Sequence, residues 1–469
     1  MGALVVALIA LAALGLVVSI VSRKTGPSAG HGNSEPEVNL RGSEVSDVQT
    51  PSTRTARTSG ESQELVLGGV PIEPNLEFQH FLFAGATGSG KTQGINLILA
   101  AARARGARAI VVDAGGEALS HFFREGDLIL NPLDARSVAW SPFAEIREPH
   151  DCDRLAKAVI PDGVGNNQEW NHYSQTLMAE LLRSMSTFKL ASTDKLRYLL
   201  TAAPVSELEP YLKGTSAQMF CQNAADKMLG SVRVILGSYM TAWPSLADKG
   251  TFSVRDWLRA DDQNGWLFVT HRDDQIAFKR LIGAWLDLAI VEGLTLDVDK
   301  KREIWFVMDE VDSLGQISSL RHALSKLRKY GCKCVLGLQT VAQLRATYGE
   351  HEAQTLMGNI GTKVILRAGD GQTAEYFSAE IGSHEIERAQ HGTSKSRGPQ
   401  YSSSDQTTSV RETKRTILDS EISGLKDLHG FLKMPGELRK ITLVHQALPR
   451  VTEPFVPKPR ETTAQTLTV

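Results

Sequence analysis

The chain has 469 residues, of which 42% are hydrophobic, 22% charged and 6% aromatic. This length accommodates two domains, and the composition is that of a globular protein with a large core. The formal net charge of −2 excludes a generally basic surface, so nucleic-acid binding would have to come from local groups of Lys and Arg. Four scattered cysteines are too few for a disulfide framework and indicate free thiols in a reducing compartment.

The N-terminus begins with an uncharged apolar run. Residues 3–21 are almost all Ala, Val, Leu, Ile and Gly, and as a helix they would rise roughly 28 Å, about the hydrocarbon thickness of a bilayer. Arg23 and Lys24 follow directly and no basic residue precedes the run, so we expect residues 1–22 to form one transmembrane helix with the bulk of the chain in the cytoplasm. A cleaved signal peptide is the alternative, but its basic residues would precede the apolar run.

Two polar segments flank the expected folded part of the chain. Residues 23–63 are rich in Ser, Thr, Gly, Pro and charge, which predicts a flexible linker. Residues 451–469 form a polar, Pro-containing tail that is too short for a further domain. Residues 392–408, rich in Ser, Thr, Gly and Gln, are expected to form a mobile loop within the folded part.

Between these segments the pattern is that of an α/β fold. Short apolar runs alternate with helical stretches, which predicts a mostly parallel central sheet covered on both faces. The runs are residues 81–84, 109–112, 128–130, 266–269, 304–308, 335–338 and 363–366.

Residues 151–248 interrupt this alternation. They have helical spacing throughout, no strong strand run, and balanced numbers of basic and acidic side chains. We therefore expect an all-α domain inserted into a nucleotide-binding domain whose two parts are residues 64–150 and 249–450.

A Gly-rich turn follows the first strand run and fits the pattern G-x-x-x-x-G-K-[ST]. Backbone N–H groups of such a loop surround phosphate oxygens, and the following helix adds its N-terminal dipole. A Lys at the end of this loop reaches the β and γ phosphates of ATP, and the hydroxyl after it binds Mg²⁺. The predicted nucleotide-binding residues are Gly85, Ala86, Thr87, Gly88, Ser89, Gly90, Lys91 and Thr92.

The strand run 304–308 ends in two acids. Asp309 is expected to hold Mg²⁺ together with Thr92, and Glu310 to polarise the attacking water. A strand that ends in a solvated acidic turn is the alternative, and the P-loop in the same chain disfavours it.

Three further residues have less specific signals. Gln339 follows the run 335–338, where its amide would sense or orient the water that attacks the γ-phosphate. The alternative is that it caps the next helix. Arg328 lies before that run and could stabilise charge on a neighbouring subunit's nucleotide, or could lie on a solvated face. Asp113 ends the run 109–112 at the edge where ligands bind, with a structural turn as an equal alternative.

Taken together, these pieces resemble the TraD/TrwB-type coupling proteins of conjugative type IV secretion, within the FtsK/HerA group of P-loop ATPases. The resemblance covers residues 64–448 in order, with the helical insertion where the family has its all-α domain. The matching motifs are residues 85–92, Asp113-Ala-Gly-Gly-Glu117, 131–134, 140–143, Asp309-Glu310, 337–339 and 421–430.

This resemblance implies a RecA-like P-loop domain and a DNA-stimulated ATPase that uses ATP and Mg²⁺. It implies a homo-hexamer at the bacterial inner membrane that couples a relaxase bound to single- or double-stranded DNA to the secretion channel. It also supports Arg328 as an arginine that acts in trans. Two departures are visible: family members commonly span the membrane twice, and some carry an arginine where this chain has Gln79.

Three other functions compete with this interpretation. A chromosome-segregating DNA translocase would usually have more spans and a C-terminal DNA-reading domain. The second is an ATPase that transfers only protein substrates, and the sequence distinguishes it poorly from a DNA-translocating coupling protein. A gate or scaffold that binds ATP without pumping is disfavoured by the intact Lys91, Thr92, Asp309 and Glu310.

Overall fold

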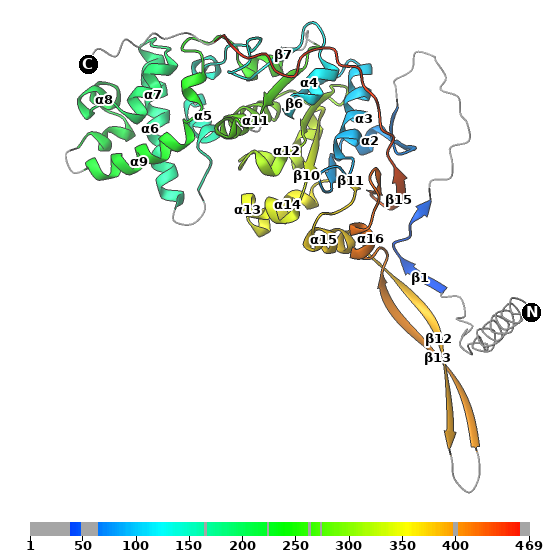
Figure 1. Ribbon diagram of the computed structural model, residues 1–469. Helices are drawn as coiled ribbons and strands as arrows, with labels where there is room; N and C mark the ends of the chain where they lie inside the picture. Colours follow the sequence, from blue (N-terminus) through cyan, green and yellow to red (C-terminus); the bar gives the residue numbers. More distant parts are fainter. Residues whose placement is uncertain are drawn as a thin grey trace, which may run out of the picture. The chain divides into compact units, whose positions relative to one another are not determined.

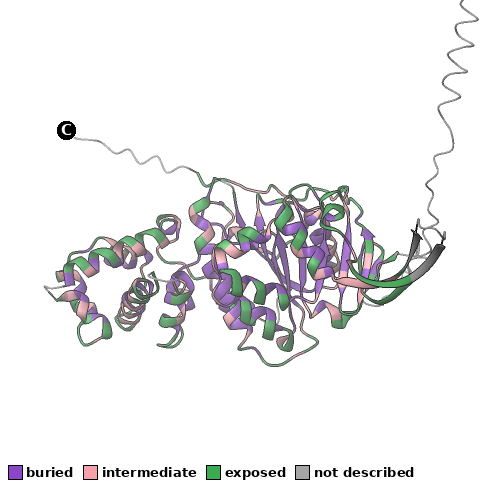
Figure 2. Cartoon of the chain, turned by 90° about the horizontal axis from the view of Figure 1, so that it is seen from below, coloured by how far each residue is buried: buried purple, intermediate pink, exposed green. Residues whose placement is uncertain are grey.

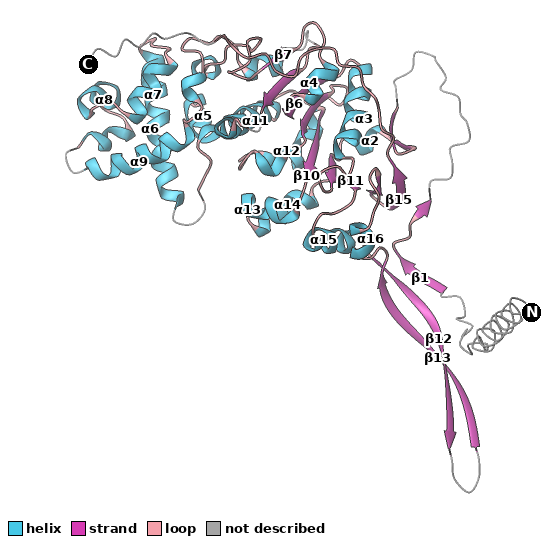
Figure 3. Ribbon diagram, viewed as in Figure 1, coloured by secondary structure: helices cyan, strands magenta, loops and turns pink. Residues whose placement is uncertain are grey.

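The computed structural model describes residues 38–47, 64–163, 167–222, 225–260, 264–272, 274–396 and 402–459. The described residues fall into two compact units (Figure 1). The smaller unit is a three-stranded sheet, and the larger one contains the α/β sheet with all of the described helices (Figure 3). The predicted transmembrane helix lies outside the described residues. No helix among the described residues is both long and apolar enough to cross a membrane.

A ten-stranded sheet organises the larger unit. Its strand order is β2-β15-β14-β11-β5-β10-β9-β6-β8-β7. The pairs from β11 to β7 are parallel, whereas β14 is antiparallel to both β11 and β15. The strands are β2 (Ser46–Asp47), β5 (Phe81–Ala84), β6 (Arg108–Ala114), β7 (Leu128–Ile129), β8 (Leu267–His271), β9 (Ile304–Met308), β10 (Cys332–Leu338), β11 (Thr362–Ile365), β14 (His429–Met434) and β15 (Glu437–Thr442). The mostly parallel α/β sheet expected from the apolar runs is therefore confirmed.

Alternate residues of the central strands face two different cores. In β5, Phe81 and Phe83 join one buried cluster, while Leu82 and Ala84 join the other. Helices α3 (Lys91–Ala104) and α4 (Glu117–Phe122) contribute to the first cluster. Helices α11 (Lys279–Gly293), α12 (Leu320–Lys326), α13 (Val341–Tyr348), α14 (Glu350–Gly358) and α15 (Gly371–Ile381) contribute to the second. Because both faces are covered, the strands are buried along their length, as the colouring of Figure 2 shows.

The remaining elements are short or helical. A separate hairpin, β3 (Leu65–Leu67) and β4 (Val70–Ile72), lies between β2 and β5 in the chain, and α2 (Pro74–Glu77) and α16 (Asp419–Ser423) connect strands. The described part of residues 151–248 contains no strand. Its α-helices are α5 (Asp151–Val159), α6 (Asn167–Thr187), α7 (Thr193–Thr201), α8 (Val205–Leu212) and α9 (Asp226–Tyr239), and α10 (Val254–Arg259) follows.

The smaller unit differs from the sequence-based expectation. Strands β12 (Ser383–Ser396) and β13 (Ser402–Arg415) pair where residues 392–408 were expected to form a mobile loop. Strand β1 (Val38–Gly42), from the expected linker 23–63, pairs antiparallel with β12. The linker also contributes β2, which joins β15. These polar strands have no periodic apolar signal, and the pairing of β1 and β2 depends on segments more than 300 residues away in the chain.

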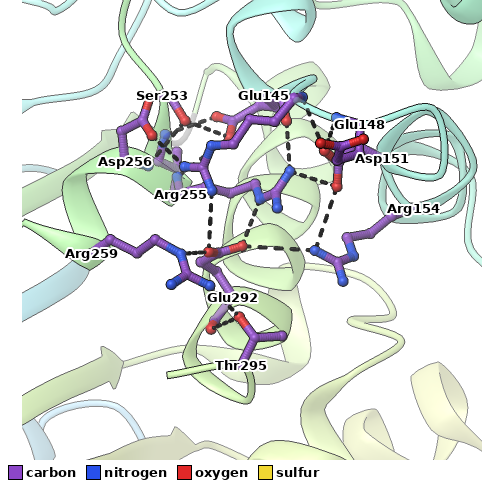
Figure 4. Close-up of polar contacts among 12 residues, drawn as sticks. Glu145, Glu148, Asp151, Arg154, Ser253, Arg255, Asp256, Arg259, Glu292 and Thr295 are labelled. Carbon is purple, nitrogen blue, oxygen red and sulfur yellow. Dashed lines mark hydrogen bonds and ion pairs between the residues drawn. The ribbon is translucent and has the colours of Figure 1, made fainter. Parts of the chain in front are cut away.

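A buried network of charges joins α5 to the elements beneath it (Figure 4). Arg255 on α10 is 7% exposed at its side chain and pairs with Asp151 on α5 at 2.8 Å and with Glu292 on α11 at 2.6 Å. Glu292 is fully buried and also pairs with Arg259. Glu145 completes the network by accepting hydrogen bonds from Ser253 Oγ and the Val254 N–H, both at 2.8 Å. The first helix of the all-helical segment is thus fixed to α10 and α11 by ion pairs as well as by packing.

Replacing Arg255 with Met should strongly destabilise the fold. The substitution removes the shared partner of Asp151 and Glu292. Arg154 stays within 3.7 Å of both carboxylates and Arg259 still pairs with Glu292, so we expect a cost near the lower end of the about 3–5 kcal/mol that is typical of a broken buried ion pair. The measurement is urea unfolding of the full chain followed by tryptophan fluorescence. Arg321→Met is the matched control, because its half-exposed pair with Glu352 should contribute at most about 1 kcal/mol. Equal effects of the two substitutions would contradict this account.

Candidate nucleotide-binding site

The P-loop connects β5 directly to α3. Gly88 and Gly90 have φ values of 77° and 112°, a left-handed region that side chains with a Cβ rarely adopt. The loop is also held on both sides, because the Gly85 N–H donates to the Leu338 oxygen at 3.1 Å and the Ala86 N–H donates to the Arg367 oxygen at 2.8 Å. The neighbouring strands β10 and β11 therefore fix where the loop begins.

Lys91 is the first residue of α3 and points back into its own loop. Its side chain is buried, and Nζ donates to the backbone oxygens of Gly85 at 2.7 Å and Ala86 at 3.3 Å. These carbonyls hold the ammonium group where phosphate oxygens would compete for it. This arrangement suits a lysine that binds the phosphates of a nucleotide.

Thr92 and Asp309 meet at the end of β9. Thr92 Oγ1 donates to Asp309 Oδ2 at 3.1 Å, while Asp309 Oδ1 is buried and has no hydrogen-bond partner among the described residues. Burial raises the pKa of Asp309, and the nearby Lys91 charge and the Thr92 hydrogen bond oppose this shift. A hydroxyl and a carboxylate with an unused buried oxygen are hard ligands that fit Mg²⁺.

Glu310 and Gln339 form the next pair along the sheet edge. Gln339 Nε2 donates to Glu310 Oε1 at 2.8 Å, so the amide fixes the orientation of the carboxylate. Together with Lys91, Thr92 and Asp309, both line a cavity of about 420 Å³. The structure thus brings together five of the six residues to which the sequence assigned catalysis or metal binding.

Arg328 is the sixth, and it lies elsewhere. It is an exposed residue of the 3₁₀ helix η7 (Leu327–Tyr330), which precedes β10, whereas Gln339 follows the same strand. The seven residues of β10 separate the two by roughly 20 Å at a rise of about 3.3 Å per residue. Arg328 therefore does not belong to the cavity of its own chain.

One wall of the cavity was not expected from the sequence. Asp427, Leu428 and His445 line it beside Gln93 of α3. The Leu428 N–H donates to the Ser89 oxygen at 2.9 Å, and the Gln446 N–H donates to Gln93 Oε1 at 3.0 Å. The motif at 421–430 contains the first part of this wall, but nothing in its residue types indicates that it lies against the P-loop.

Asp113 also reaches this edge of the sheet. It is buried at the end of β6, next to β9, and accepts the Leu119 N–H at 2.7 Å. Burial raises the pKa of Asp113 to about 7, although the hydrogen bonds from α4 oppose the shift. Asp113 is therefore part of a structural turn and lies at the ligand-binding edge as well.

The sheet, the P-loop and the acidic end of β9 define a P-loop nucleotide-binding protein. A family model for the type IV secretion-system coupling protein DNA-binding domain matches residues 64–444. The chain therefore belongs to the family of type IV secretion-system coupling proteins.

Individual relatives agree with this assignment. Coupling protein TraD of Escherichia coli K12 is 30% identical over 467 residues, which are 97% of this chain and 64% of TraD. Protein VirD4 of Agrobacterium fabrum is 24% identical over 342 residues, which are 66% of this chain and 50% of VirD4. The chain thus spans less than two thirds of the length of either relative.

Solved structures of the bacterial conjugative coupling protein TrwB have the same fold. The unbound form of TrwBdeltaN70 is 32% identical, with a TM-score of 0.80 over 92% of this chain and all of that one. A second TrwB structure, with a TM-score of 0.79, is a complex with ADP and Mg²⁺.

Replacing Gly337 with Ala should displace Asp309 and weaken Mg²⁺ binding in the cavity. The added Cβ would lie 1.9 Å from the backbone oxygen of Asp309 and 2.6 Å from its Oδ1, so Asp309 would have to move. We expect the Mg²⁺-dependent part of ADP affinity to fall at least tenfold, measured by titration of fluorescent ADP with and without Mg²⁺. Gly358→Ala is the control, because its Cβ would meet nothing within 4 Å. Unchanged affinity of Gly337→Ala would show that the position of Asp309 is unimportant.

Proposed function

We propose that this chain is an ATP-driven DNA translocase that couples a relaxase–DNA substrate to a type IV secretion channel. The observation that carries the proposal is the complete nucleotide cavity of Lys91, Thr92, Asp309, Glu310 and Gln339 within a chain of the coupling-protein family. The relatives TraD and TrwB are named as coupling proteins, which supports the same role here.

Each residue of the cavity has a distinct role in this proposal. Backbone N–H groups of the P-loop and Lys91 hold the phosphates, and Thr92 with Asp309 would hold Mg²⁺, which supplies positive charge against the phosphate oxygens. Glu310 accepts a proton from the attacking water, and Gln339 orients Glu310 through the 2.8 Å hydrogen bond between them.

The active form is a ring, with six subunits as the family resemblance implies. Closed rings use head-to-tail interfaces, so one subunit can complete the site of the next. Arg328 suits this role because it is exposed and forms no ion pair with the described residues, roughly 20 Å from its own cavity along β10. Action on a neighbour's nucleotide would make hydrolysis depend on assembly.

DNA is the expected substrate that passes through the ring. The matching family model is described as a DNA-binding domain, and TrwB as a conjugative coupling protein. Since the net charge is only −2, contacts with DNA must come from local Lys and Arg, and binding should weaken steeply with salt. Turnover that responds to protein substrates but not to DNA would favour the alternative of a protein-secretion ATPase.

The proposed location is the bacterial inner membrane, with residues 3–21 as an uncleaved anchor. The uncharged run and the following Arg23 and Lys24 support it. N-terminal sequencing of protein from isolated membranes tests it, because a mature chain that starts beyond about residue 20 would identify a cleaved signal peptide.

Substitutions at the two ends of the catalytic cavity should have different effects. Lys91→Ala should abolish ATP turnover and weaken nucleotide binding. Glu310→Gln should retain bound ATP but lower turnover at least about 100-fold, because it keeps the size of the side chain and removes the base. Both variants are compared with the wild-type full chain in two measurements. These are ATP turnover with and without single-stranded DNA, and retention of labelled ATP. Wild-type turnover by Glu310→Gln would reassign the base.

Mixed rings test the action of Arg328 in trans. Arg328→Ala and Lys91→Ala should each be inactive alone, but a mixed ring contains boundaries where an intact P-loop faces an intact arginine, so turnover should partly return. ATP turnover is measured after mixing, with assembly checked by crosslinking. Full activity of Arg328→Ala alone would remove this residue from the mechanism. Lys329→Ala, a change at the adjacent exposed residue, is the matched control.

A further inference from the structure

A second acidic strand end lies beside Asp309. Strands β6 and β9 are parallel, with Val112 opposite Met308, so the next residues, Asp113 and Asp309, end neighbouring strands side by side. Asp113 is 5% exposed. Two carboxylates therefore lie together at the sheet edge, and Asp113 is on the side of Asp309 opposite to Gln339. Of the two carboxylates, only Asp309 has a role in the proposed function.

The turn after Asp113 brings a third carboxylate to this place. Gly115 and Gly116 have φ values of 82° and 77°, and Asp113 Oδ2 accepts the Leu119 N–H within α4. The turn is enclosed, because a Cβ on Gly116 would lie 2.4 Å from the Pro454 oxygen. As a result Glu117, the first residue of α4, returns to the edge of the sheet.

A small cavity lies between these groups. Its volume is about 40 Å³, and Thr92, Asn96, Asp113, Glu117 and Asp309 supply its polar lining. That volume is large enough for one or more water molecules, since one water needs roughly 10–15 Å³. The cavity shares Thr92 and Asp309 with the nucleotide cavity.

The three carboxylates have no ion-pair partner among the described residues. The nearby ammonium group of Lys91 donates to the P-loop carbonyls of Gly85 and Ala86, and its positive charge also acts on Asp309. Asp309 Oδ1 is buried without a hydrogen-bond partner among the described residues, and Glu117 is exposed, so the negative charge around this cavity is only partly offset and a hydrated divalent cation would relieve the remaining repulsion. Mg²⁺ bound to a nucleotide usually keeps several waters, and these need hydrogen-bond acceptors.

We propose that Glu117 and Asp113 form an outer carboxylate shell for the nucleotide-bound Mg²⁺. Glu117 accepts hydrogen bonds from water in the cavity beside Thr92 and Asp309, and Asp113 positions Glu117 by fixing the start of α4. Both are positioning residues rather than metal ligands. This inference rests on the proposed function, because it requires that the chain bind ATP or ADP with Mg²⁺.

The test is the Mg²⁺ dependence of ADP binding by the full chain. Fluorescent ADP is titrated at a series of Mg²⁺ concentrations and in excess chelator. Glu117→Gln should need about tenfold more Mg²⁺ for half-maximal enhancement of affinity, as is typical when an outer-shell partner is removed, with chelator-only affinity unchanged. Turnover by Glu117→Gln should recover at high Mg²⁺, which a lost catalytic base would not allow.

Three further variants separate positioning from simple stabilisation of the fold. Asp113→Asn retains an oxygen that can accept the Leu119 N–H, so it should keep the start of α4 fixed and leave the Mg²⁺ requirement near that of the wild type, whereas Asp113→Ala loses this acceptor and should shift the Mg²⁺ requirement in the same direction as Glu117→Gln. Glu125→Gln removes an exposed acid in the turn after α4 and should behave as wild type.

The outcomes distinguish this inference from the function on which it rests. A wild-type chain that binds no ADP in the presence of Mg²⁺ would overturn the proposed function itself. Wild-type Mg²⁺ dependence in Glu117→Gln, or weakening that is equal with and without Mg²⁺, would overturn the outer shell alone.

Discussion

The parallel register of β6, β9 and β10 is the constraint on which the site depends. Met308 lies opposite Val112 on one side and Leu336 on the other, so the residues after these positions emerge at one edge. Asp309 therefore has Asp113 on one flank and Gly337 on the other, and the missing Cβ of Gly337 leaves room for its backbone. Strand β5, which pairs with β10, delivers the P-loop to the same edge. A register shift of one residue would turn these side chains to opposite faces.

Buried polar groups hold the layers around this edge. Lys333 of β10 pairs with Glu77 at 2.5 Å and with Glu303 at 2.8 Å at the other end of the strands. The network around Arg255 and Glu292 plays a similar part beneath α5. Such pairs gain little net stability over apolar packing, but losing one partner is costly, so they favour a single arrangement of the helices that they join.

The sequence predicts the central sheet and most of the nucleotide cavity because local patterns encode both. Apolar runs of three to five residues identify the strands, and the P-loop motif and the acids after 304–308 are contiguous in the chain. The roles assigned to these residues remain predictions, and so do the domain boundaries. The wall of Asp427, Leu428 and His445 could not be predicted, because it meets the P-loop only through contacts between distant segments. The same holds for the smaller unit, where polar strands pair across more than 300 residues.

Strand β10 has a mechanical consequence for a ring of the proposed kind. It is buried along all seven residues and paired with β5 and β9 on its two sides, so it is held rigidly within the sheet. Gln339 follows one end and donates a hydrogen bond to Glu310 in the subunit's own site, whereas Arg328 precedes the other end and is exposed. A small shift of this strand with its sheet, when one nucleotide is cleaved, would move Arg328 against the adjoining subunit. It would need no large rearrangement between the two subunits. The order in which the subunits hydrolyse ATP would then be set inside each subunit, by a single strand.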